Sequence, residues 1–194
     1  GNSYFETLEI SKISIENKID TYVNYMRNVL PSTELISKYI DSNKINPKNI
    51  IVDITGTILN NGSHFLSLLS MIFNLNLNHA QTTYENKNKL IINLPNLQIK
   101  VNSYNYNYPF FNISIFHENG LIKYDEIESK WKIFEIGKSN IKNIRMPTLI
   151  HKYDYDLEIS NAQDYFIRKV VSSKIKENQY LSLEHSLSIM KVID

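Results

Sequence analysis

The chain has 194 residues, 42% of them apolar, and carries 21 basic against 20 acidic side chains. This length suits one domain with a sizeable core, and the near-neutral, scattered charge argues against nucleic acid as a partner. The absence of cysteine excludes disulfides and thiolate metal sites and favours a cytoplasmic location. The longest apolar run is far shorter than the roughly 20 residues of a membrane span, so no membrane partner is expected.

The N-terminal part of the sequence alternates between helical and extended patterns. Apolar spacing of three and four residues indicates a helix, whereas a dense run of β-branched and aromatic residues indicates a buried strand. The predicted elements are a helix over residues 4–15, a buried strand over 19–27, a helix over 34–41 and a strand over 50–55.

Residues 56–73 form the most apolar segment of the sequence. Large apolar side chains lie on most sides of this segment when it is drawn as a helix. A helix of this kind must be buried. The segment is therefore predicted to lie at the centre of the core.

Beyond Asn78 the apolar residues recur with a period of two, which is typical of half-buried strands. Strands are predicted around residues 97–101, 111–115, 121–124 and 131–136. The Asn119-Gly120 pair predicts a type I′ hairpin, because both central residues of that turn need a positive φ.

The C-terminal part of the sequence returns to helical spacing. After a polar stretch at residues 153–156, either Ser160 or Asn161 caps a predicted helix, and Ser182 opens a last one. Helices, then strands, then helices indicate the α+β class. The prediction is a mostly antiparallel, open sheet with helices packed on one face.

Three segments taken together resemble the Gfo/Idh/MocA oxidoreductases, the family of glucose-fructose oxidoreductase and inositol dehydrogenase. Residues 23–31 are similar to the strand that leaves the family's Rossmann domain, although Asn28 stands where the family has a second Arg. Residues 56–69 are similar to a buried helix with an Asp-x-x-x-His-x-x-Asp motif. Residues 181–187 are similar to the start of the terminal helix.

The resemblance implies a two-domain enzyme, in which a Rossmann domain holds NAD or NADP and an α+β domain covers a sugar substrate. The five glycines stand at 1, 56, 62, 120 and 137, so the G-x-G-x-x-G fingerprint is missing and no cofactor binding by this chain is expected. Residues 1–17 would then be the last helix of an absent Rossmann domain. Residues 18–194 would form the substrate-binding domain, with the open sheet serving for oligomerisation.

Asn60 and His64 are the predicted catalytic residues. If this stretch is helical, they lie one turn apart on the same face, and a neutral imidazole can take the hydroxyl proton when hydride leaves carbon. Asn60 stands where the family often has Asp, so it would orient His64 or hydrogen-bond the sugar. Ser67 replaces the second carboxylate of the motif. The alternative for His64 is a histidine satisfied by its neighbours on a buried helix.

Arg27, Arg145 and Tyr25 are the predicted substrate-binding residues. Guanidinium groups suit the phosphates of a sugar nucleotide, although an ion pair is an equal alternative for each arginine. The other histidines lack metal-like spacing, so no metal is predicted. Tyr104, Tyr106 and Tyr108 form an aromatic stripe that serves either internal packing or contact with a partner subunit.

Two functions follow from these observations. In the first, the parent protein oxidises or reduces a sugar, including a nucleotide-linked one, with NAD(P), and this chain alone is inactive. In the second, the chain is a non-catalytic binding or assembly module that keeps the same fold. The replacement of carboxylates at Asn60 and Ser67 favours the second slightly.

Overall fold

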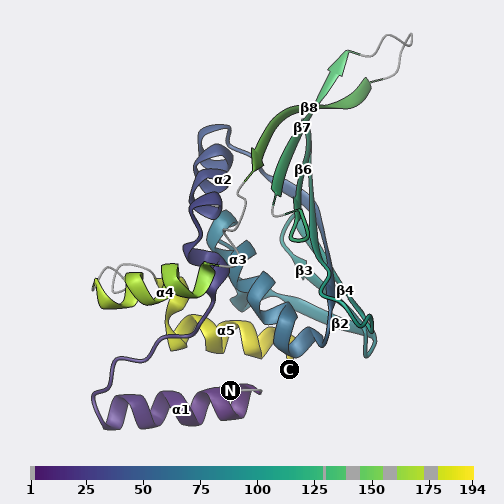
Figure 1. Ribbon diagram of the computed structural model, residues 1–194. Helices are drawn as coiled ribbons and strands as arrows, with labels where there is room; N and C mark the ends of the chain where they lie inside the picture. The colour runs from purple at the N-terminus through teal and green to yellow at the C-terminus, as the bar shows by residue number, and fades with distance from the viewer. Residues whose placement is uncertain (1–2, 129, 139–144, 155–160, 173–178) are drawn as a thin grey trace.

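The structure is a computed structural model that describes residues 3–128, 130–138, 145–154, 161–172 and 179–194. Figure 1 shows one sheet with helices on one of its faces. The helices are α1 (Tyr4–Glu16), η1 (Met26–Val29), α2 (Pro31–Ser42), η2 (Ile58–Gly62), α3 (Ser63–Phe73), η3 (Leu77–His79), α4 (Ala162–Val171), η5 (Gln179–Leu181) and α5 (Leu183–Ile193). The strands are β1 (Pro47–Thr55), β2 (Gln81–Asn86), β3 (Lys89–Leu94), β4 (Leu97–Tyr104), β5 (Phe111–His117), β6 (Gly120–Asp125), β7 (Lys130–Lys138) and β8 (Arg145–Asp154).

The eight strands lie in the order β2-β3-β4-β1-β5-β6-β7-β8. Strand β1 runs parallel to β4 and antiparallel to β5, and the other neighbouring strands are antiparallel. The sheet does not close, and none of the described helices lies on its second face (Figure 1). The predicted α+β class and the mostly antiparallel open sheet are confirmed.

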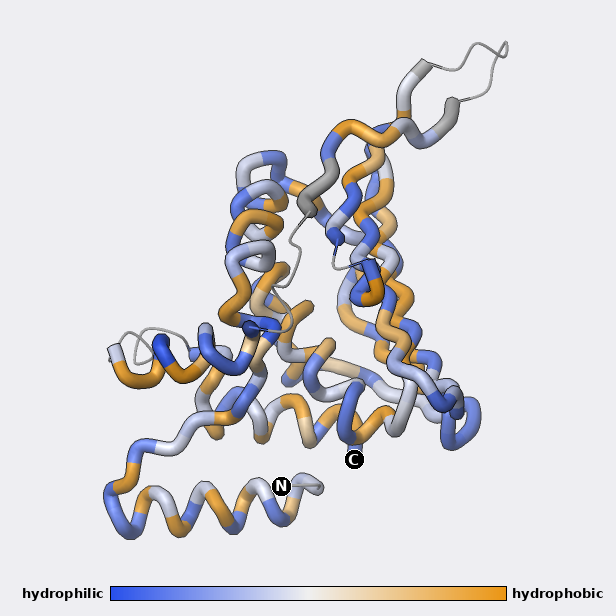
Figure 2. Tube along the Cα trace, viewed as in Figure 1, coloured by the Kyte–Doolittle hydropathy of each residue, from blue (hydrophilic) through white to orange (hydrophobic). Residues whose placement is uncertain are grey.

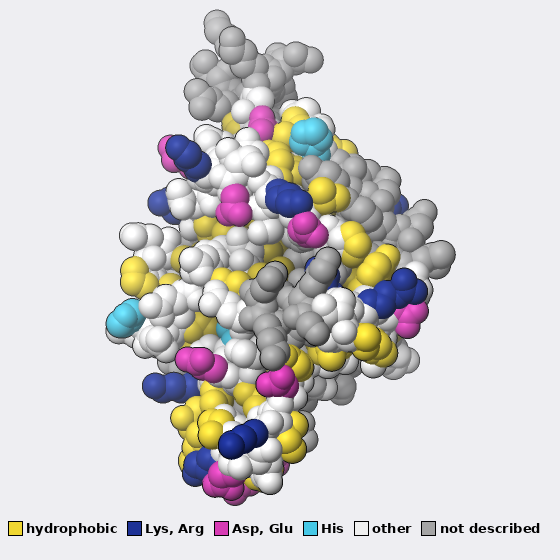
Figure 3. All heavy atoms as spheres, turned by 90° about the vertical axis from the view of Figure 1, so that its left-hand side faces the viewer, with side chains coloured by type: hydrophobic (Ala, Val, Ile, Leu, Met, Phe, Trp, Pro, Cys, Tyr) yellow, Lys and Arg dark blue, Asp and Glu magenta, His cyan; other side chains and the backbone are white. Residues whose placement is uncertain are grey.

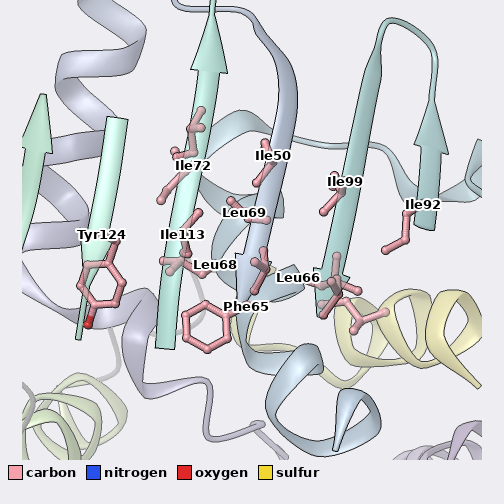
Figure 4. Close-up of a cluster of buried hydrophobic side chains, with 14 of the residues drawn as sticks. Ile50, Phe65, Leu66, Leu68, Leu69, Ile72, Ile92, Ile99, Ile113 and Tyr124 are labelled. Carbon is pink, nitrogen blue, oxygen red and sulfur yellow. The ribbon is translucent and has the colours of Figure 1, made fainter. Parts of the chain in front are cut away.

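The core lies between the central strands and α3. Alternate residues of β1, β4 and β5 are fully buried, among them Ile50, Ile99 and Ile113, and their side chains meet those of Leu66 and Leu69 from α3 (Figure 4). Figure 2 shows apolar and polar residues alternating along these strands. This alternation follows from the two-residue period of a strand. The prediction that the apolar segment of residues 56–73 is buried is therefore confirmed.

The predicted strand over residues 19–27 is wrong. Its one strand-like contact is a bridge between Tyr22 and Ser182, and residues 26–29 form a turn of 3-10 helix. The segment does lie in the interior at its end, where Tyr25 is only 2% exposed. A buried apolar run forms a strand only where another strand offers its backbone groups, and the neighbour at this position is a helix.

The sequence reading missed three strands, β2, β3 and β8. All six residues of β2 are exposed, so its sequence lacks the apolar alternation that reveals a half-buried strand. Strand β8 lies at the opposite edge of the sheet and contains Pro147, a residue that is typical of edge strands.

The hairpin at Gly120 forms, but its predicted type I′ turn is wrong. Strand β6 begins at Gly120, which pairs with His117, and neither Asn119 nor Gly120 has a positive φ. Glycine is required here for another reason. A Cβ at position 120 would lie 2.0 Å from the carbonyl oxygen of Phe134, so only glycine allows β6 and β7 to approach this closely.

Of the two helix N-caps that were predicted in the C-terminal part of the chain, one forms. Ser182 caps α5, where its hydroxyl accepts a hydrogen bond from the backbone N–H of His185 at 3.1 Å. Asn161 precedes α4 without a capping bond from its side chain. Ser160, the alternative cap, and part of the polar stretch lie outside the described residues.

Helix α1 lies apart from the sheet and contacts α5 (Figure 1). Thr7 is buried, whereas Phe5, Ile13 and Ile15 are 74%, 57% and 74% exposed. Figure 3, which faces the helical side, shows apolar side chains on the surface at this lower end of the molecule. Within the part of the chain that the structure describes, no helix has the length and apolarity to cross a membrane.

Candidate functional site

A cavity of about 240 Å³ lies between α3, α5 and the segment that precedes η1. It brings together three of the predicted site residues, Tyr25, Asn60 and His64. The rest of its lining combines hydroxyl groups with apolar side chains, namely Thr7, Val23, Thr57, Leu59, Ser63, Leu183, Ser186 and Met190.

The turn η2 fixes the positions of Asn60 and His64. It is a single π-helical turn that Thr57 caps, with the hydroxyl accepting a hydrogen bond from the backbone N–H of Asn60 at 3.2 Å. The regular helix α3 starts directly afterwards, and the Ser63 hydroxyl donates to the carbonyl of Asn60 at 2.6 Å. Single π-helical turns that adjoin or interrupt an α-helix are frequent at functional sites. Asn60 and His64 both line the cavity, and their contact with one substrate hydroxyl stays a prediction.

His64 is held as a neutral imidazole. Burial lowers its pKa from 6.5 to about 4, with a smaller contribution from the positive charge of Arg27. Its Nδ1 is buried and has no hydrogen-bond partner among the described residues, and its ring meets the ring of Tyr25 edge-on at 5.3 Å. The ring is therefore unprotonated at neutral pH, and one of its two nitrogens carries a lone pair that can accept a hydrogen bond from a substrate hydroxyl. A pKa of about 4 makes it a weak base.

Tyr25 joins His64 to helix α5. Its hydroxyl lies 3.1 Å from the hydroxyl of Ser186, and burial raises its pKa above 10.0. The phenol therefore stays protonated at neutral pH and can donate or accept a hydrogen bond. This placement agrees with the predicted contact between Tyr25 and substrate, which stays a prediction.

Arg27 does not line the cavity. Its guanidinium makes two hydrogen bonds to Glu126, of 2.8 and 2.7 Å. It also lies 4.9 and 5.1 Å from the ring centroids of Phe65 and Phe111, which stack on each other. The ion-pair alternative is thus present, in a buried form rather than a surface one. Arg145 begins β8, and its side chain lies outside the described part of the structure. A substrate contact by either arginine stays a prediction.

A second buried polar cluster, next to the cavity, was not anticipated from the sequence. Asn28 donates to the hydroxyl of Ser67 at 2.7 Å, and that hydroxyl lies 3.1 Å from Nε2 of His185. Ser67, which stands where the family motif has a carboxylate, thus contacts His185 and not His64. The three residues are distant in sequence, so no local signal connects them.

A wider polar pocket of about 640 Å³ lies on the other side of α5, against the loop that follows α3. Neither Asn60 nor His64 lines it. We assign the candidate site to the smaller cavity, because it contains the unpartnered imidazole. Among the described residues, no group of histidines and carboxylates could hold a metal ion.

No protein-family model matches the sequence, and no curated protein matches it. Solved structures do match the fold. The 3-ketoreductase KijD10 from Actinomadura kijaniata, in complex with NADP, aligns with a TM-score of 0.68 and 10% identity over 100% of this chain and 65% of its own. UDP-N-acetylglucosamine 3-dehydrogenase GnnA from Acidithiobacillus ferrooxidans gives 0.64 and 10% over 97% of this chain and 65% of its own.

A third match is the super-repressor mutant of Gal80p from Saccharomyces cerevisiae, with a TM-score of 0.71 and 10% identity over 100% of this chain and 67% of that one. The chain thus spans about two thirds of the length of these proteins. Its fold is that of the C-terminal part of the Gfo/Idh/MocA-type oxidoreductases. The resemblance seen in the sequence is confirmed at the level of the fold.

Proposed function

We propose that this chain is the substrate-binding part of an NAD(P)-dependent sugar oxidoreductase, with nucleotide-linked sugars as the substrate class. One observation carries the proposal: Asn60, His64 and Tyr25 line the same cavity, and the imidazole is neutral and unpartnered there. Two of the similar structures, a UDP-N-acetylglucosamine 3-dehydrogenase and a 3-ketoreductase, support the substrate class. The lack of cysteine supports a cytoplasmic location.

The proposed chemistry assigns one task to each residue. His64 accepts the proton of a sugar hydroxyl as the C–H hydrogen leaves as hydride, and it returns that proton in the reductive direction. The amide of Asn60 hydrogen-bonds the same hydroxyl and holds it near the imidazole, since an amide cannot take the proton itself. Tyr25 binds a neighbouring hydroxyl of the sugar. The nicotinamide would supply or take up the hydride, and no residue of this chain is assigned to its binding.

We propose that a cofactor-binding domain covers the outer face of α1 and the segment of residues 19–25. Three large apolar side chains of α1 are more than half exposed, and the β-branched run beside it has a single strand-like bridge. Monomeric proteins rarely expose contiguous apolar surface of this kind. The same domain would close the cavity that Thr7 and Val23 line from this side.

We further propose that two copies associate through the helix-free face of the sheet. The aligned residues Phe116, Leu121, Phe134 and Leu149 form an apolar row across β5, β6, β7 and β8 on this face. Phe116 and Leu149 are 39% and 47% exposed. Burial of such a row is the typical driving force of a homodimer interface.

The test is to express the full reading frame and screen sugar nucleotides, UDP-N-acetylglucosamine first, for a change in NAD(P)H absorbance. The variant His64→Ala should lower kcat by roughly 10²- to 10⁴-fold, the range expected for loss of a general base. The matched control is His79→Ala, because His79 is exposed and lies outside the cavity. Unchanged turnover in His64→Ala would remove this residue from the mechanism.

A non-catalytic binding module is the second candidate. It is favoured by Asn60 and Ser67, which replace the two carboxylates of the family motif, and by the similarity to a repressor mutant. Calorimetry of sugar-nucleotide binding, together with the NAD(P)H absorbance assay, separates the two candidates. A module binds the sugar nucleotide without turnover, and His64→Ala weakens that binding, whereas an enzyme also changes the absorbance of the nicotinamide.

A further inference from the structure

Three tyrosines form a stack at one end of the helix-free sheet face. The rings of Tyr104 and Tyr106 lie 5.4 Å apart at an angle of 3°, and those of Tyr106 and Tyr108 lie 5.2 Å apart at 4°. Tyr106 is 48% exposed and Tyr108 is 51% exposed. Within the described residues, Tyr108 has no ring neighbour other than Tyr106, so the stack ends in an open aromatic face.

Hydrogen bonds hold the base of the tyrosine stack in place. The hydroxyl of Tyr104 donates to Asp53 at 3.2 Å, and the amide of Asn102 donates to the same carboxylate oxygen at 2.9 Å. Phe110 packs edge-on against both Tyr104 and Tyr106. The platform is therefore preorganised, which lowers the entropic cost of binding a ligand.

The far end of the loop is tied to β1 as well. The backbone N–H of Thr55 donates to the carbonyl of Phe110 at 2.9 Å, and the N–H of Phe110 donates to the Thr55 hydroxyl at 3.1 Å. Both ends of the segment that carries Tyr106 and Tyr108 are thus fixed to the sheet. The exposed rings stand on a rigid base.

The tyrosine stack is separate from the apolar row proposed for dimerisation. Tyr104 pairs with Thr55 on β1, whereas Phe116 of the apolar row pairs with Asn49. Six residues of strand separate these two positions, which corresponds to about 20 Å. The interface proposed above therefore leaves the stack without an assigned role.

We propose that the tyrosine stack is a binding platform for a neutral sugar ring, which continues the stack on the free face of Tyr108. The electron-rich face of an aromatic ring attracts the C–H groups of a pyranose. The exposed amides of Asn105 and Asn107, next to the tyrosines, can bond the sugar hydroxyls. Residues 101–110 contain no Lys or Arg that could pair with a phosphate, so the ligand class is a neutral saccharide and not a nucleotide.

The test is an NMR titration of the chain with glucose, N-acetylglucosamine and cellotriose, followed through the tyrosine ring protons. Saturable shifts with a Kd on the order of millimolar are expected, as for a ligand that contacts one exposed ring. Tyr108→Ala should weaken binding roughly tenfold, whereas Tyr108→Phe and Tyr108→Trp should retain it because each keeps an aromatic face.

The matched control is Tyr84→Phe, because Tyr84 is 44% exposed on β2 and stacks on no ring of the described residues. Circular dichroism of each variant checks its fold, and His64→Ala should leave the shifts of Tyr108 unchanged. The proposal is overturned if no shift saturates, or if Tyr108→Ala binds as the wild type does. It is also overturned if Tyr108→Ala abolishes a concentration-dependent self-association, which would assign the stack to a second copy.

Discussion

Two buried polar clusters lie side by side beneath the sheet, and they differ in how far their hydrogen bonds are satisfied. In one, Asn28, Ser67 and His185 form a connected network, and the neighbouring guanidinium of Arg27 is paired separately with Glu126. In the other, His64 faces a cavity and its Nδ1 has no partner. Burial lowers the pKa of both histidines to about 4.

The comparison shows that a shifted pKa alone does not identify a working histidine. His185 and His64 share the same shift and the same main cause, and His185 lines the wider pocket. Only His64 lines a cavity together with Asn60 and Tyr25. A buried polar group that has partners stabilises the fold, whereas one that lacks them is costly and needs another explanation. The hydrogen-bond partners of a buried histidine, and not its pKa, therefore distinguish a structural histidine from a candidate functional one.

The largest loss of stability is expected when the ion pair between Arg27 and Glu126 is broken. Arg27→Met should lower the free energy of unfolding by about 3–5 kcal/mol, because it leaves the carboxylate of Glu126 buried without its cation. Urea denaturation measures the change. The double variant Arg27→Met/Glu126→Leu is the control and should recover much of the loss, since it removes both charges. A loss below about 1 kcal/mol in the single variant would mean that the pair behaves like a surface ion pair.

The next effect is a loss of stability in acid. Both histidines are neutral in the folded and unfolded chain above pH 6.5, and their folded pKa of about 4 lies below the unfolded value. The unfolded chain therefore takes up protons first between pH 6.5 and 4, and stability falls by up to roughly 3 kcal/mol for His64 and by less for His185, whose ring is more exposed to solvent. Urea midpoints across this pH window measure the slope. His64→Gln and His185→Gln should each reduce it, and an unchanged slope in either variant contradicts the burial of that ring.

The smallest expected losses of stability come from removing one side chain in each cluster, Ser67 in the first and His64 in the second. Ser67→Ala should cost about 1–3 kcal/mol, because Asn28 and His185 lose their shared partner in the interior. His64→Gln should cost less than about 1 kcal/mol at pH 7, because its Nδ1 makes no hydrogen bond that can be lost. Thermal unfolding of both variants measures the difference. Equal losses would show that His64 is part of the scaffold after all.

The sequence predicted the fold class and the buried central helix because both depend on local periodicity. It failed at residues 19–27, since their β-branched composition cannot reveal that no strand lies beside them. It also missed β2, whose six exposed residues carry no apolar alternation. Edge strands are specified by their neighbours more than by their own pattern.

The candidate site also contains residues that the sequence could predict and residues that it could not. Asn60 and His64 were found through a motif within one turn of chain, and Tyr25 through a neighbouring segment; all three line one cavity. The network of Asn28, Ser67 and His185 could not be found, because its members lie 39 and 118 residues apart. Contacts over such distances depend on the packing of helices, which periodicity does not encode.

An unclosed sheet leaves two rows of backbone groups without a neighbouring strand, one along β2 and one along β8. Strand β2 presents only exposed residues of mainly polar type, which discourages edge-to-edge pairing between molecules. Strand β8 instead exposes Leu149 and Ile150, at 47% and 40%. Aggregation of concentrated protein should therefore begin at β8, and a lysine in place of Ile150 is the substitution that would oppose it.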